Sequence, residues 1–392
     1  MLFRLSTVYK VSLYVIIVLL FVIGCAPSPE YLAKTGKRIG LDNDYIRVLL
    51  LKDQAKVIIE TTSKTKVVQL SNNTIVYNGN PKRLEFFIHK LPEAMQFETW
   101  NNVIIVNGIQ VRGMIQLLPV LGKIQVVNVL KMNEYLYGVL PSEIMPGWPI
   151  ETLKAQAVAA RTYAYYHIMK NNSTYYDLDA STNFQVYRGA ISETETTNKA
   201  VDSTSGIIMV YNSIPILAYF HSTCGGRTAD DRFVWKGEDL PYLTSVNCSY
   251  CKNSPVYSWQ VNISLDEIYE ALLKKYKTVG QIKAITLGRE DNRVSNIKIE
   301  HSNGIIRMTG NDFRMMFETK KIKSLYFEAN QTHDGLTLNG HGWGHGVGMC
   351  QWGAKEMAGR GKNFYDILKY YYRGISVVSI NTVPQKYRKS NF

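Results

Sequence analysis

The sequence lacks the patterns that mark several large classes of protein. It contains no HExxH helix of a zinc peptidase, no Walker sequence for nucleotide phosphates and no GxGxxG dinucleotide fingerprint. RNA-recognition, zinc-finger and basic-zipper signatures are also missing, and the basic residues are scattered rather than clustered. No order of Ser, His and Asp, or of Cys and His, indicates a nucleophilic enzyme. We therefore expect no nucleic acid among its partners.

Acidic residues are less numerous than basic residues. The chain has 32 of them against 45 basic residues, which gives a net charge of +13. An excess of positive charge favours an anionic neighbourhood, such as a membrane surface, a wall polymer or nucleic acid. With 392 residues, 46% hydrophobic and 20% charged, the chain is long enough for one large globular domain or two modest ones. Its 26 tyrosines suit binding sites that are half apolar and half wet.

The first 24 residues contain no acidic residue and have the pattern of a secretory signal. Their apolar run, Val11 to Ile23, is short for a membrane-spanning helix, which needs about 20 residues. The run leads to Cys25 in a sequence that resembles a bacterial lipobox, so we expect export and lipid attachment at Cys25. Ala26 is not the aspartate that favours retention at the inner membrane of diderm bacteria. The alternative, an uncleaved N-terminal anchor, also places the remainder outside the cytoplasm.

Short runs of β-branched residues, separated by polar turns, predict a β-rich region at residues 26–122. An Asn107-Gly108 turn is expected to join two strands as a hairpin. Residues 123–384 mix helical and strand patterns and form a second domain, with a short tail at 385–392. We therefore predict an α+β protein. The first expected strands are Ile46–Leu51, Val57–Thr62, Lys66–Leu70, Thr74–Tyr77, Val103–Val106, Gln110–Leu117 and Ile124–Leu130.

The stretch from Met132 to Lys170 is the one around which the second domain is organised. From Pro141 the density of proline and glycine predicts a loop. Pro149 suits the first position of the long Ala-rich helix that follows. Glu143 lies in the loop among apolar neighbours, so desolvation could raise the pKa of its carboxyl and keep it protonated near neutral pH. The alternative is an ordinary solvated glutamate.

Further elements beyond this helix have recognisable end signals. Residues 194–204 read as a charged helix, Ser264 and Glu267 form the capping box of a helix through Tyr276, and Asn311 caps a short helix. The later expected strands are Gly206–Val210, Ile214–His221, Ile282–Arg289, Val294–His301 and Ile305–Thr309, of which the last three form a meander.

Glycine occupies every second position from Gly340 to Gly348. In a strand, this alternation places His341, Trp343 and His345 on one face and leaves the other face bare, so that it can lie tightly against another element. Two imidazoles with an indole between them suggest a sugar or peptide groove. A structural role for the histidines is the alternative.

A second set of residues has the inventory of a tetrahedral Cys₃His zinc site. It consists of two pairs, His221 with Cys224 and Cys248 with Cys251, each with two residues between its members. Because no coordination position would stay open, the Zn²⁺ would be structural. The alternative is a disulfide from Cys224 to one of the other two thiols, which export favours. Cys350 stands alone, and we interpret it as a buried free thiol.

Carboxylates that could serve in glycoside cleavage are Glu143, Asp231 and Glu238. A hydrolase needs two cooperating carboxyl groups. Among the candidates, only Glu143 has the apolar neighbours expected of a general acid.

Four long motifs in one order resemble the SpoIID/LytB family, which comprises relatives of stage II sporulation protein D and the amidase enhancers. The motifs are YLYGVLPSEIMPGWPIETLKAQAVAARTYAYYH, FQVYRG, FHSTCGGRT with VWKGEDLPYLTSV, and GHGWGHGVGMCQWGAKEMAGRGKNFYDILKYYYRG. The resemblance covers roughly residues 123–383. The family's usual Met after the glutamate is displaced, since Ile144 and Met145 follow Glu143. We expect this difference to leave the acid intact.

The resemblance implies peptidoglycan chemistry. Catalytic members are lytic transglycosylases, which cut between N-acetylmuramic acid and N-acetylglucosamine in strands stripped of stem peptides and leave a 1,6-anhydro end. The resemblance assigns catalysis to Glu143, as acid and then base, with no cofactor required. The downstream cysteines fall where family members hold zinc. The alternative from another class is a glycan-binding enhancer of a cell-wall amidase that does not cut.

The muramic C6 hydroxyl, as internal nucleophile, explains why one carboxylate suffices, and its proximity supplies much of the rate. We expect polar and aromatic residues around Glu143 to orient it or to bind saccharide. The candidates are Gln156, Arg161, Gln185, Tyr187, His341, Trp343, His345 and Gln351.

Overall fold

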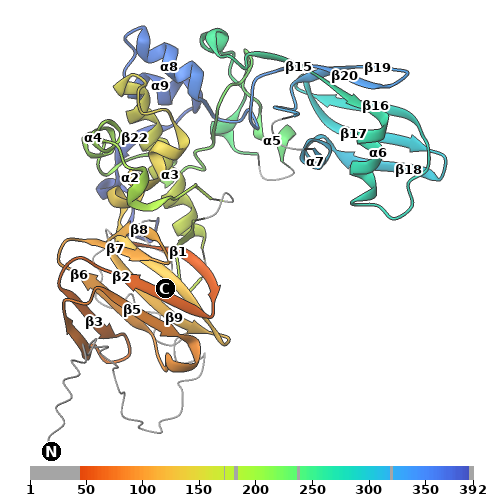
Figure 1. The fold of residues 1–392 in the computed structure, drawn as a ribbon. Coiled ribbons are helices and arrows are strands. Elements are labelled where there is room, and N and C mark those ends of the chain that lie inside the picture. The colour runs from red at the N-terminus through yellow and green to blue at the C-terminus, as the bar shows by residue number, and fades with distance from the viewer. Residues whose placement is uncertain (1–44, 172, 181–183, 236–238, 318–320, 388–392) are drawn as a thin grey trace, which may run out of the picture.

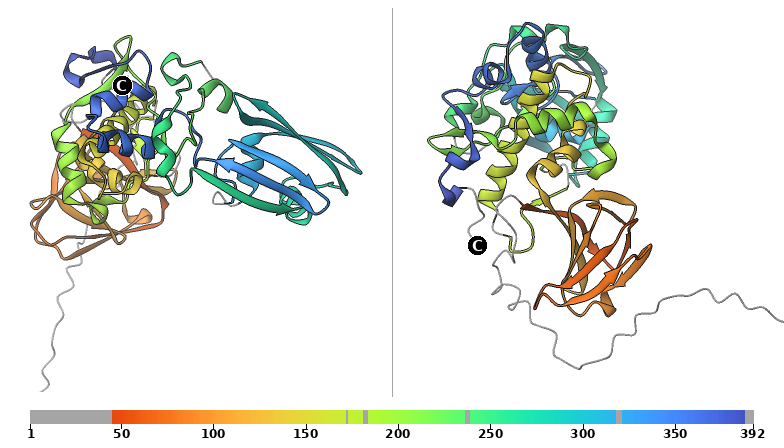
Figure 2. Two further views of the ribbon diagram at one scale, coloured as in Figure 1. Left: turned by 90° about the horizontal axis from the view of Figure 1, so that it is seen from above. Right: turned by 90° about the vertical axis from the view of Figure 1, so that its left-hand side faces the viewer.

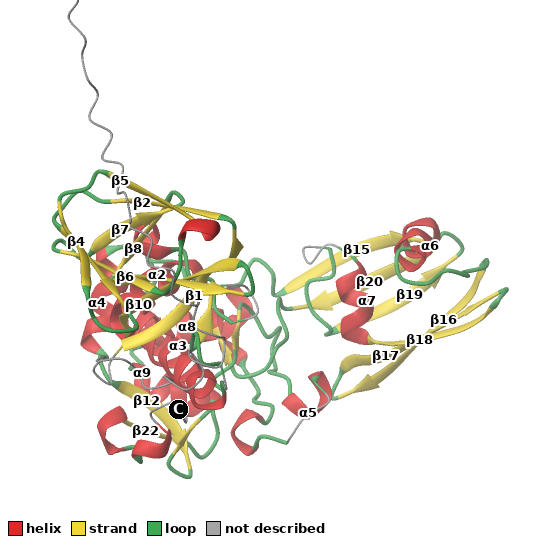
Figure 3. Cartoon of the chain, turned by 90° about the horizontal axis from the view of Figure 1, so that it is seen from below, coloured by secondary structure: helices red, strands yellow, loops and turns green. Residues whose placement is uncertain are grey.

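The computed structural model describes residues 45–171, 173–180, 184–235, 239–317 and 321–387. Three parts are visible in Figure 1: a β-lobe (45–131), a helical body (132–257 and 342–387) and a side lobe (258–341) that projects from the body. Helices gather in the body, whereas both lobes are built mainly of strands (Figure 3). The expected α+β class is confirmed. Cys25 and the rest of the secretory segment lie outside the described residues.

Two sheets with a shared core form the β-lobe. The strand orders are β11-β1-β10-β9-β6-β3-β4 and β5-β2-β7-β8. Side chains alternate along each strand, so that Val57 and Ile59 of one sheet and Phe97 and Ile115 of the other are fully buried in one cluster. The strands are β1 (Tyr45–Gln54), β2 (Lys56–Glu60), β3 (Thr65–Gln69), β4 (Ile75–Gly79), β5 (Arg83–Phe87), β6 (Met95–Thr99), β7 (Val103–Val106), β8 (Ile109–Arg112), β9 (Met114–Val120), β10 (Lys123–Lys131) and β11 (Leu178–Asp179).

The Asn107-Gly108 hairpin is confirmed, with positive φ values of 47° and 84° at the two turn residues. Its second strand is shorter than expected and ends before Gly113. A Cβ at Gly113 would lie 2.4 Å from the carbonyl oxygen of Val129, and the φ of 77° also favours glycine. The chain therefore bends there, and β9 joins the other sheet.

The β-lobe extends further than the boundary at residue 122 that the sequence predicts. Strand β10 lies between β1 and β9 in the large sheet, and it leads directly into the first helix of the body. By packing, the β-lobe therefore ends at Lys131.

Glu143 is the last residue of helix α2 (Met132–Glu143), so the expectation of a loop from Pro141 is wrong. The helix continues because its inner face, which includes Tyr135 and Leu136, is fully buried. Proline removes one backbone donor, and this loss falls in the last turn, where Ile144 N donates to Leu140 O at 3.1 Å. Tertiary packing therefore overrides the local proline signal.

Helix α3 (Ile150–Lys170) lies at the centre of the body, and its alanines make it narrow enough to be covered on several sides. Ala157, Ala160 and Ala164 belong to the core shared with the β-lobe, whereas Ala155 and Ala159 belong to the core of the body. The predicted long helix is confirmed, although Pro149 is its N-cap rather than its first residue. With 21 residues it is a long helix, yet no helix in the described ranges has the length and apolar character needed to cross a membrane.

Around α3, the body contains four further helices and two small sheets among its described residues. Thr194 caps α4, as the predicted helix at 194–204 requires. The expected strand at 214–221 is divided: its start pairs with β12, and its end pairs in parallel with residues 349–350. These elements are α4 (Glu195–Ser203), α5 (Asp231–Val234), α8 (Gln351–Gly359), α9 (Phe364–Tyr371), β12 (Ile207–Tyr211), β13 (Ile214–Pro215), β14 (Phe220–His221), β21 (Met349–Cys350) and β22 (Ser376–Ser379).

The side lobe has its own core, separate from the body (Figure 2). The predicted capping box of Ser264 and Glu267 and the predicted meander are confirmed. The cap of the short helix is Thr309 rather than Asn311, because Thr309 Oγ1 accepts from Asp312 N at 3.0 Å. The elements are β15 (Ser258–Ser264), β16 (Ile282–Glu290), β17 (Arg293–His301), β18 (Gly304–Thr309), β19 (Phe327–Thr332), β20 (Gly335–His341), α6 (Leu265–Leu273) and α7 (Gly310–Met316).

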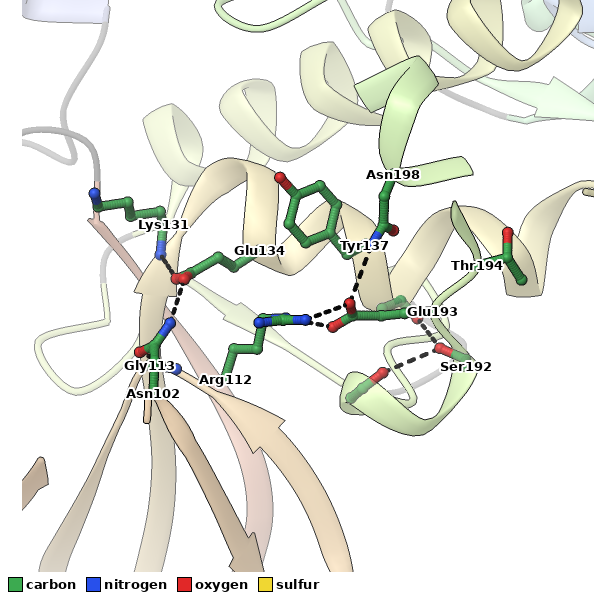
Figure 4. A network of polar contacts seen from close by, with 12 residues as sticks. Asn102, Arg112, Gly113, Lys131, Glu134, Tyr137, Ser192, Glu193, Thr194 and Asn198 are labelled. Carbon is green, nitrogen blue, oxygen red and sulfur yellow. Dashed lines mark hydrogen bonds and ion pairs between the residues drawn. The ribbon is translucent and has the colours of Figure 1, made fainter. Parts of the chain in front are cut away.

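A polar network joins the β-lobe to the body (Figure 4). Arg112 donates from Nε and Nη2 to the two carboxylate oxygens of Glu193 at 2.7 and 2.8 Å. Glu134 of α2 accepts from Asn102 Nδ2 at 2.6 Å and from Lys131 N at 3.0 Å. Bidentate, charge-assisted contacts fix orientation as well as distance. They hold α2, the helix that ends at Glu143, in a defined position on the β-lobe.

Candidate active site and cysteine cluster

The Glu143 carboxyl is partly buried at the C-terminal end of α2. Its Oε1 accepts a hydrogen bond from Val186 N at 3.3 Å. Burial raises the pKa of Glu143, and the bond from Val186 only partly opposes that rise. A carboxylate at the negative end of a helix dipole is also disfavoured. The position therefore favours the protonated acid, as the sequence predicts.

Three buried glutamine side chains are linked to the Glu143 segment by hydrogen bonds or by their position in the chain. Gln351 Nε2 donates to the backbone oxygen of Glu143 at 2.8 Å and to Gln156 Oε1 at 3.2 Å. Gln185 Oε1 accepts from Tyr135 OH at 3.3 Å. Within the described ranges, the Nε2 groups of Gln156 and Gln185 have no partner, although both residues are almost fully buried. Because buried donors are nearly always satisfied, these two amide nitrogens need a hydrogen-bond partner that the described residues do not supply, such as an ordered water or a ligand.

Aromatic rings flank the site on the α8 side. Trp148, five residues after Glu143, meets Trp352 edge to face with ring centroids 5.1 Å apart. Lys355 Nζ lies 4.4 Å from the Trp352 ring centroid. Neither tryptophan is among the site residues predicted from the sequence. Trp148 is close to Glu143 in sequence and Trp352 directly follows Gln351, and this closeness could have identified both tryptophans as site residues.

A second chain of ring contacts begins beside the Val186 segment. Phe184 contacts His167 at 5.1 Å between ring centroids, and His167 contacts Tyr163 at 4.3 Å. Tyr163 in turn contacts Tyr219 at 5.9 Å, and Tyr219 contacts Trp235 at 4.5 Å. Such rings present apolar faces with polar edges, which suits the faces and hydroxyl groups of sugars.

His167 is a further residue that the sequence analysis missed. Burial lowers the pKa of its imidazole to about 4, so the ring is neutral at neutral pH. Its Nε2 is buried and has no hydrogen-bond partner among the described residues. The imidazole therefore has an unused hydrogen-bonding nitrogen and carries no charge at neutral pH.

Arg161 does not face this site, so its assignment to substrate binding is wrong. It is fully buried on the opposite side of α3 and donates to Ile207 O at 3.2 Å and to Val201 O at 3.1 Å. The guanidinium therefore fastens α3 to α4 and β12. A residue five positions from Gln156 points elsewhere because helical neighbours on one face are three or four apart.

Tyr187 is also structural rather than substrate-binding. Its hydroxyl donates to Asn128 Oδ1 at 2.8 Å, and its ring stacks on Tyr135 with centroids 5.4 Å apart. The ring fills the space beside Gly138, where a Cβ would lie 2.6 Å from it. Only 6% of the residue is exposed. It joins β10 to α2 beneath the site.

The glycine-rich run is not a strand, so its histidines and tryptophan do not share one face. Gly342 and Gly348 have φ values of 75° and 70°, in the left-handed region. A Cβ at Gly342 would lie 2.3 Å from Thr223 O, and one at Gly348 would lie 2.0 Å from Tyr219 O. The run does lie tightly against another segment, as the sequence predicts. It does so through glycines with positive φ values rather than as an extended strand.

The three residues of this run consequently have different positions. His341 ends β20 in the side lobe, and Trp343 exchanges backbone hydrogen bonds with Thr223. His345 Nε2 donates to Phe220 O at 2.9 Å, while Nδ1 accepts from Val347 N. Burial lowers the pKa of His345 to about 4. With both nitrogens engaged, His345 orders the loop, and its ring contacts Tyr219 and Trp235 of the aromatic chain at 5.5 and 5.0 Å between centroids.

Four cysteines, rather than three and a histidine, form the candidate metal centre. The Sγ atoms of Cys224, Cys248, Cys251 and Cys350 all lie within 4.8 Å of one another, and all four residues are fully buried. Cys350 is buried and not in a disulfide, as predicted, but it does not stand alone. Parallel pairing of β14 with β21, a contact between distant segments, brings it to the cluster.

His221 is absent from this group of ligand atoms. Its Nδ1 donates to Val347 O at 3.0 Å, and its Nε2 has no partner in the described part of the chain. Burial and the neighbouring His345 hold the pKa of His221 well below its usual value. The structure thus replaces the predicted Cys₃His set by a Cys₄ set.

The thiol geometry fits a tetrahedral zinc ion better than a disulfide. Four thiolates at the usual Zn–S distance of about 2.3 Å are separated by about 3.8 Å from one another. Cys224 Sγ and Cys251 Sγ are 3.4 Å apart, whereas a disulfide requires about 2.05 Å. Cys350 also caps α8, whose first residue is Gln351, so the cluster helps to position the glutamine that contacts Glu143.

Asp231 does not contribute to the electrostatic environment of Glu143. Asp231 begins α5 and accepts from Leu240 N, and burial raises its pKa to about 6. Glu238 lies outside the described residues. No second carboxylate in the described ranges contributes to the pKa shift of Glu143. The site therefore has one acid surrounded by neutral polar groups and aromatic rings.

The chain is similar to several known proteins. Residues 121–211 match the family model of SpoIID, stage II sporulation protein, and residues 247–348 match a domain of unknown function, DUF8618. Stage II sporulation protein D of Bacillus subtilis is 33% identical over 67% of this chain and 79% of its own length. An uncharacterized protein of Brachyspira hyodysenteriae is 38% identical over 81% of this chain and 86% of its own length. The amidase enhancer of Bacillus subtilis is 29% identical over 62% of this chain and 40% of its own length.

The fold and the site thus define an α+β protein whose candidate site has one partly buried carboxyl group, that of Glu143, near buried glutamine side chains. The chain belongs to the SpoIID family, and the resemblance on the four sequence motifs is confirmed.

Proposed function

We propose that this chain is an exported lytic transglycosylase that cleaves the bond between N-acetylmuramic acid and N-acetylglucosamine in peptide-free glycan strands. The observation that carries the proposal is Glu143: a partly buried carboxyl with a raised pKa, bordered by buried amides that lack partners. Membership in the SpoIID family supports the same activity, because the resemblance implies it.

The proposed reaction uses Glu143 twice. The protonated carboxyl donates its proton to the glycosidic oxygen, and the bond from C1 of the muramic residue to that oxygen breaks. The C6 hydroxyl of the same residue attacks C1 and gives its proton to the Glu143 carboxylate, which restores the acid. The product is a 1,6-anhydromuramic end, and no water or second carboxylate takes part.

The neighbours of Glu143 have matching roles in this proposal. Gln156, Gln185 and Gln351 offer amide groups to sugar hydroxyls and acetamido groups, and Trp148 and Trp352 offer ring faces. His167 stays neutral and supplies a hydrogen-bonding nitrogen. Placing the reacting hydroxyl against C1 in a fixed geometry supplies much of the rate.

The deciding assay incubates the purified protein with glycan strands that lack stem peptides. Mass spectrometry of the products would show 1,6-anhydromuramic ends if the proposal is right. The second candidate function, suggested by the similarity to a protein named amidase enhancer, is glycan binding without cleavage. Strands that are bound but stay whole would support that function and contradict ours.

The pH dependence of cleavage should reflect the acid form of Glu143. Because burial raises its folded-state pKa above the usual glutamate value, the protonated fraction persists to higher pH and is lost as pH rises through that raised value. We expect kcat/KM to fall on the alkaline side, about tenfold per pH unit, with an apparent pKa above that of a free glutamate. A rate that rises with pH through this range would exclude Glu143 as the general acid.

We also propose a structural Zn²⁺ held by Cys224, Cys248, Cys251 and Cys350. The ion would order the loops that meet at β14 and β21, and it has no part in the reaction. Because four thiolates complete a tetrahedral coordination shell, the proposed zinc site does not need His221 as a ligand.

The proposed location is a membrane surface outside the cytoplasm, with a lipid on Cys25. A variant with Cys25→Ser should then be absent from the membrane fraction and should not incorporate labelled fatty acid. Labelling of this variant as strong as that of the unaltered protein would contradict the anchor.

A further inference from the structure

The side lobe contains a cavity of about 590 Å³ far along the chain from Glu143. Its walls come from the turn between β16 and β17 and from the neighbouring strands β19 and β20. Small-ligand sites usually measure about 300–1,000 Å³. The cavity is therefore large enough for a short saccharide.

The lining combines hydrogen-bond donors and acceptors in nearly balanced charge. Arg289 brings one guanidinium, Asp291 and Glu328 bring two carboxylates, and Asn292 and Asn339 bring amides. This balance disfavours phosphate or another polyanion, which would need an excess of cations. Groups of both kinds instead match sugar hydroxyls, which donate and accept at once.

Several lining groups keep hydrogen-bonding capacity that the protein does not use. Asp291 Oδ1 pairs with Arg227 Nη2 at 2.9 Å, but its Oδ2 is buried without a partner among the described residues. Asn339 Oδ1 accepts from Gln260 Nε2 at 2.8 Å, and no hydrogen bond from its own amide nitrogen appears within the described ranges. The amide nitrogen of Asn339 is therefore a donor that a ligand can use, whereas Asp291 Oδ2, which has almost no exposed surface, is not open to the cavity.

The walls are held firmly enough to form a site rather than a chance hollow. Arg289 Nη2 donates to Phe327 O at 2.6 Å, which ties the β16 end to β19. The Tyr326 ring lies between the Arg293 guanidinium, 5.1 Å from its centroid, and the His341 ring at 5.2 Å. Arg293 is itself buried and donates to Arg227 O at 2.9 Å. Binding groups on braced strands lose little freedom when a ligand arrives.

We propose that this cavity is a second saccharide-binding site, which holds a short segment of peptide-free glycan through the hydroxyl and acetamido groups of its sugars. Tyr326 and His341 contribute rings to the wall, and Arg289, Glu328 and Asn339 supply the polar contacts. A strand held in the side lobe stays near the body after a cut at Glu143. The choice of glycan rests on the proposed function, whereas the existence of the site rests on the cavity alone.

The test uses the whole exported chain with Glu143→Gln, so that no glycan is cut. Isothermal titration with a peptide-free tetrasaccharide of alternating N-acetylglucosamine and N-acetylmuramic acid counts the ligands bound per chain. We expect two, and one after Arg289→Ala with Glu328→Ala. Asn339→Tyr, which fills the cavity instead of emptying it, should also leave one. Glu290→Ala, an exposed glutamate next to Arg289 that does not line the cavity, should leave two.

The outcomes separate this proposal from the proposed function. If both cavity variants bind as many ligands as the Glu290→Ala control, with unchanged thermal unfolding midpoints, the second site does not exist, even if the unaltered chain cuts glycan. If the cavity variants lose one ligand but the unaltered chain makes no anhydro ends, the site stands and the enzyme proposal fails. Binding at the second site only by fragments that retain stem peptides would overturn the saccharide assignment.

Discussion

Replacing Glu143 by glutamine is expected to lower the rate of glycan cleavage by about 10³-fold or more, because general acid–base groups contribute about 10²–10⁴-fold and this one acts in both directions. Glutamine has almost the same shape and can still accept the bond from Val186, so the fold should survive. The measurement is the rate at which 1,6-anhydromuramic ends appear by mass spectrometry. Because the substitution removes the proton but retains the contacts, substrate affinity should change little.

A matched control for this variant is Glu195→Gln, which makes the same substitution at an exposed position in the first turn of α4. It should cut at the rate of the unaltered protein. Cleavage by Glu143→Gln at the control rate would show that another group is the acid. Equal loss in both variants would indicate an effect of net charge on binding to the wall rather than an effect on the reaction.

The sequence predicted those parts of the fold that depend on local patterns. Alternating β-branched residues placed most strands of the β-lobe but missed β5 and β6, the Asn107-Gly108 turn placed its hairpin, and Ser264 with Glu267 placed the start of α6. Each of these signals acts over a few residues and needs no distant partner.

The errors arose where distant contacts decide the conformation. Pro141 predicted a loop, but burial of the inner face of α2 carries the helix through it to Glu143. The glycine alternation predicted a strand, but close approach to Thr223 and Tyr219 needs positive φ values instead. In both places the local preference is overruled by packing against segments far along the chain.

In the candidate site, too, local patterns identified some residues, whereas others depend on contacts between distant segments. Glu143 could be chosen from its apolar neighbours and its motif, and Gln156, Gln185 and Gln351 do meet around it. Arg161 could not be told from a substrate-binding arginine, because the sequence does not show which face of α3 is covered by α4 and β12. Only the pairing of β14 with β21 reveals that Cys350 belongs with the other thiols.

Removing one thiol of the cysteine cluster is expected to have the largest effect on stability. Cys350→Ser should weaken zinc binding by at least about 100-fold, because even indirect ligand contacts are worth about 10–100-fold. If the metal is bound only by the folded chain, a 100-fold change at fixed free zinc corresponds to about 2.7 kcal/mol of unfolding free energy. For a unit of about 150–250 residues, this loss lowers the thermal midpoint by roughly 5–11 °C.

The control for Cys350→Ser is His221→Gln. Together the two variants distinguish the Cys₄ ligand set from the Cys₃His set that the sequence alone suggested. Metal analysis of the purified proteins should find one zinc per chain in the unaltered protein and in His221→Gln, and much less in Cys350→Ser. His221 Nδ1 already donates to Val347 O, and its other nitrogen is not among the clustered ligand atoms, so its loss leaves four thiolates in place. Zinc lost from His221→Gln but retained by Cys350→Ser would restore the Cys₃His assignment. Disulfide-linked cysteines in the unaltered protein, with no zinc, would reject both sets.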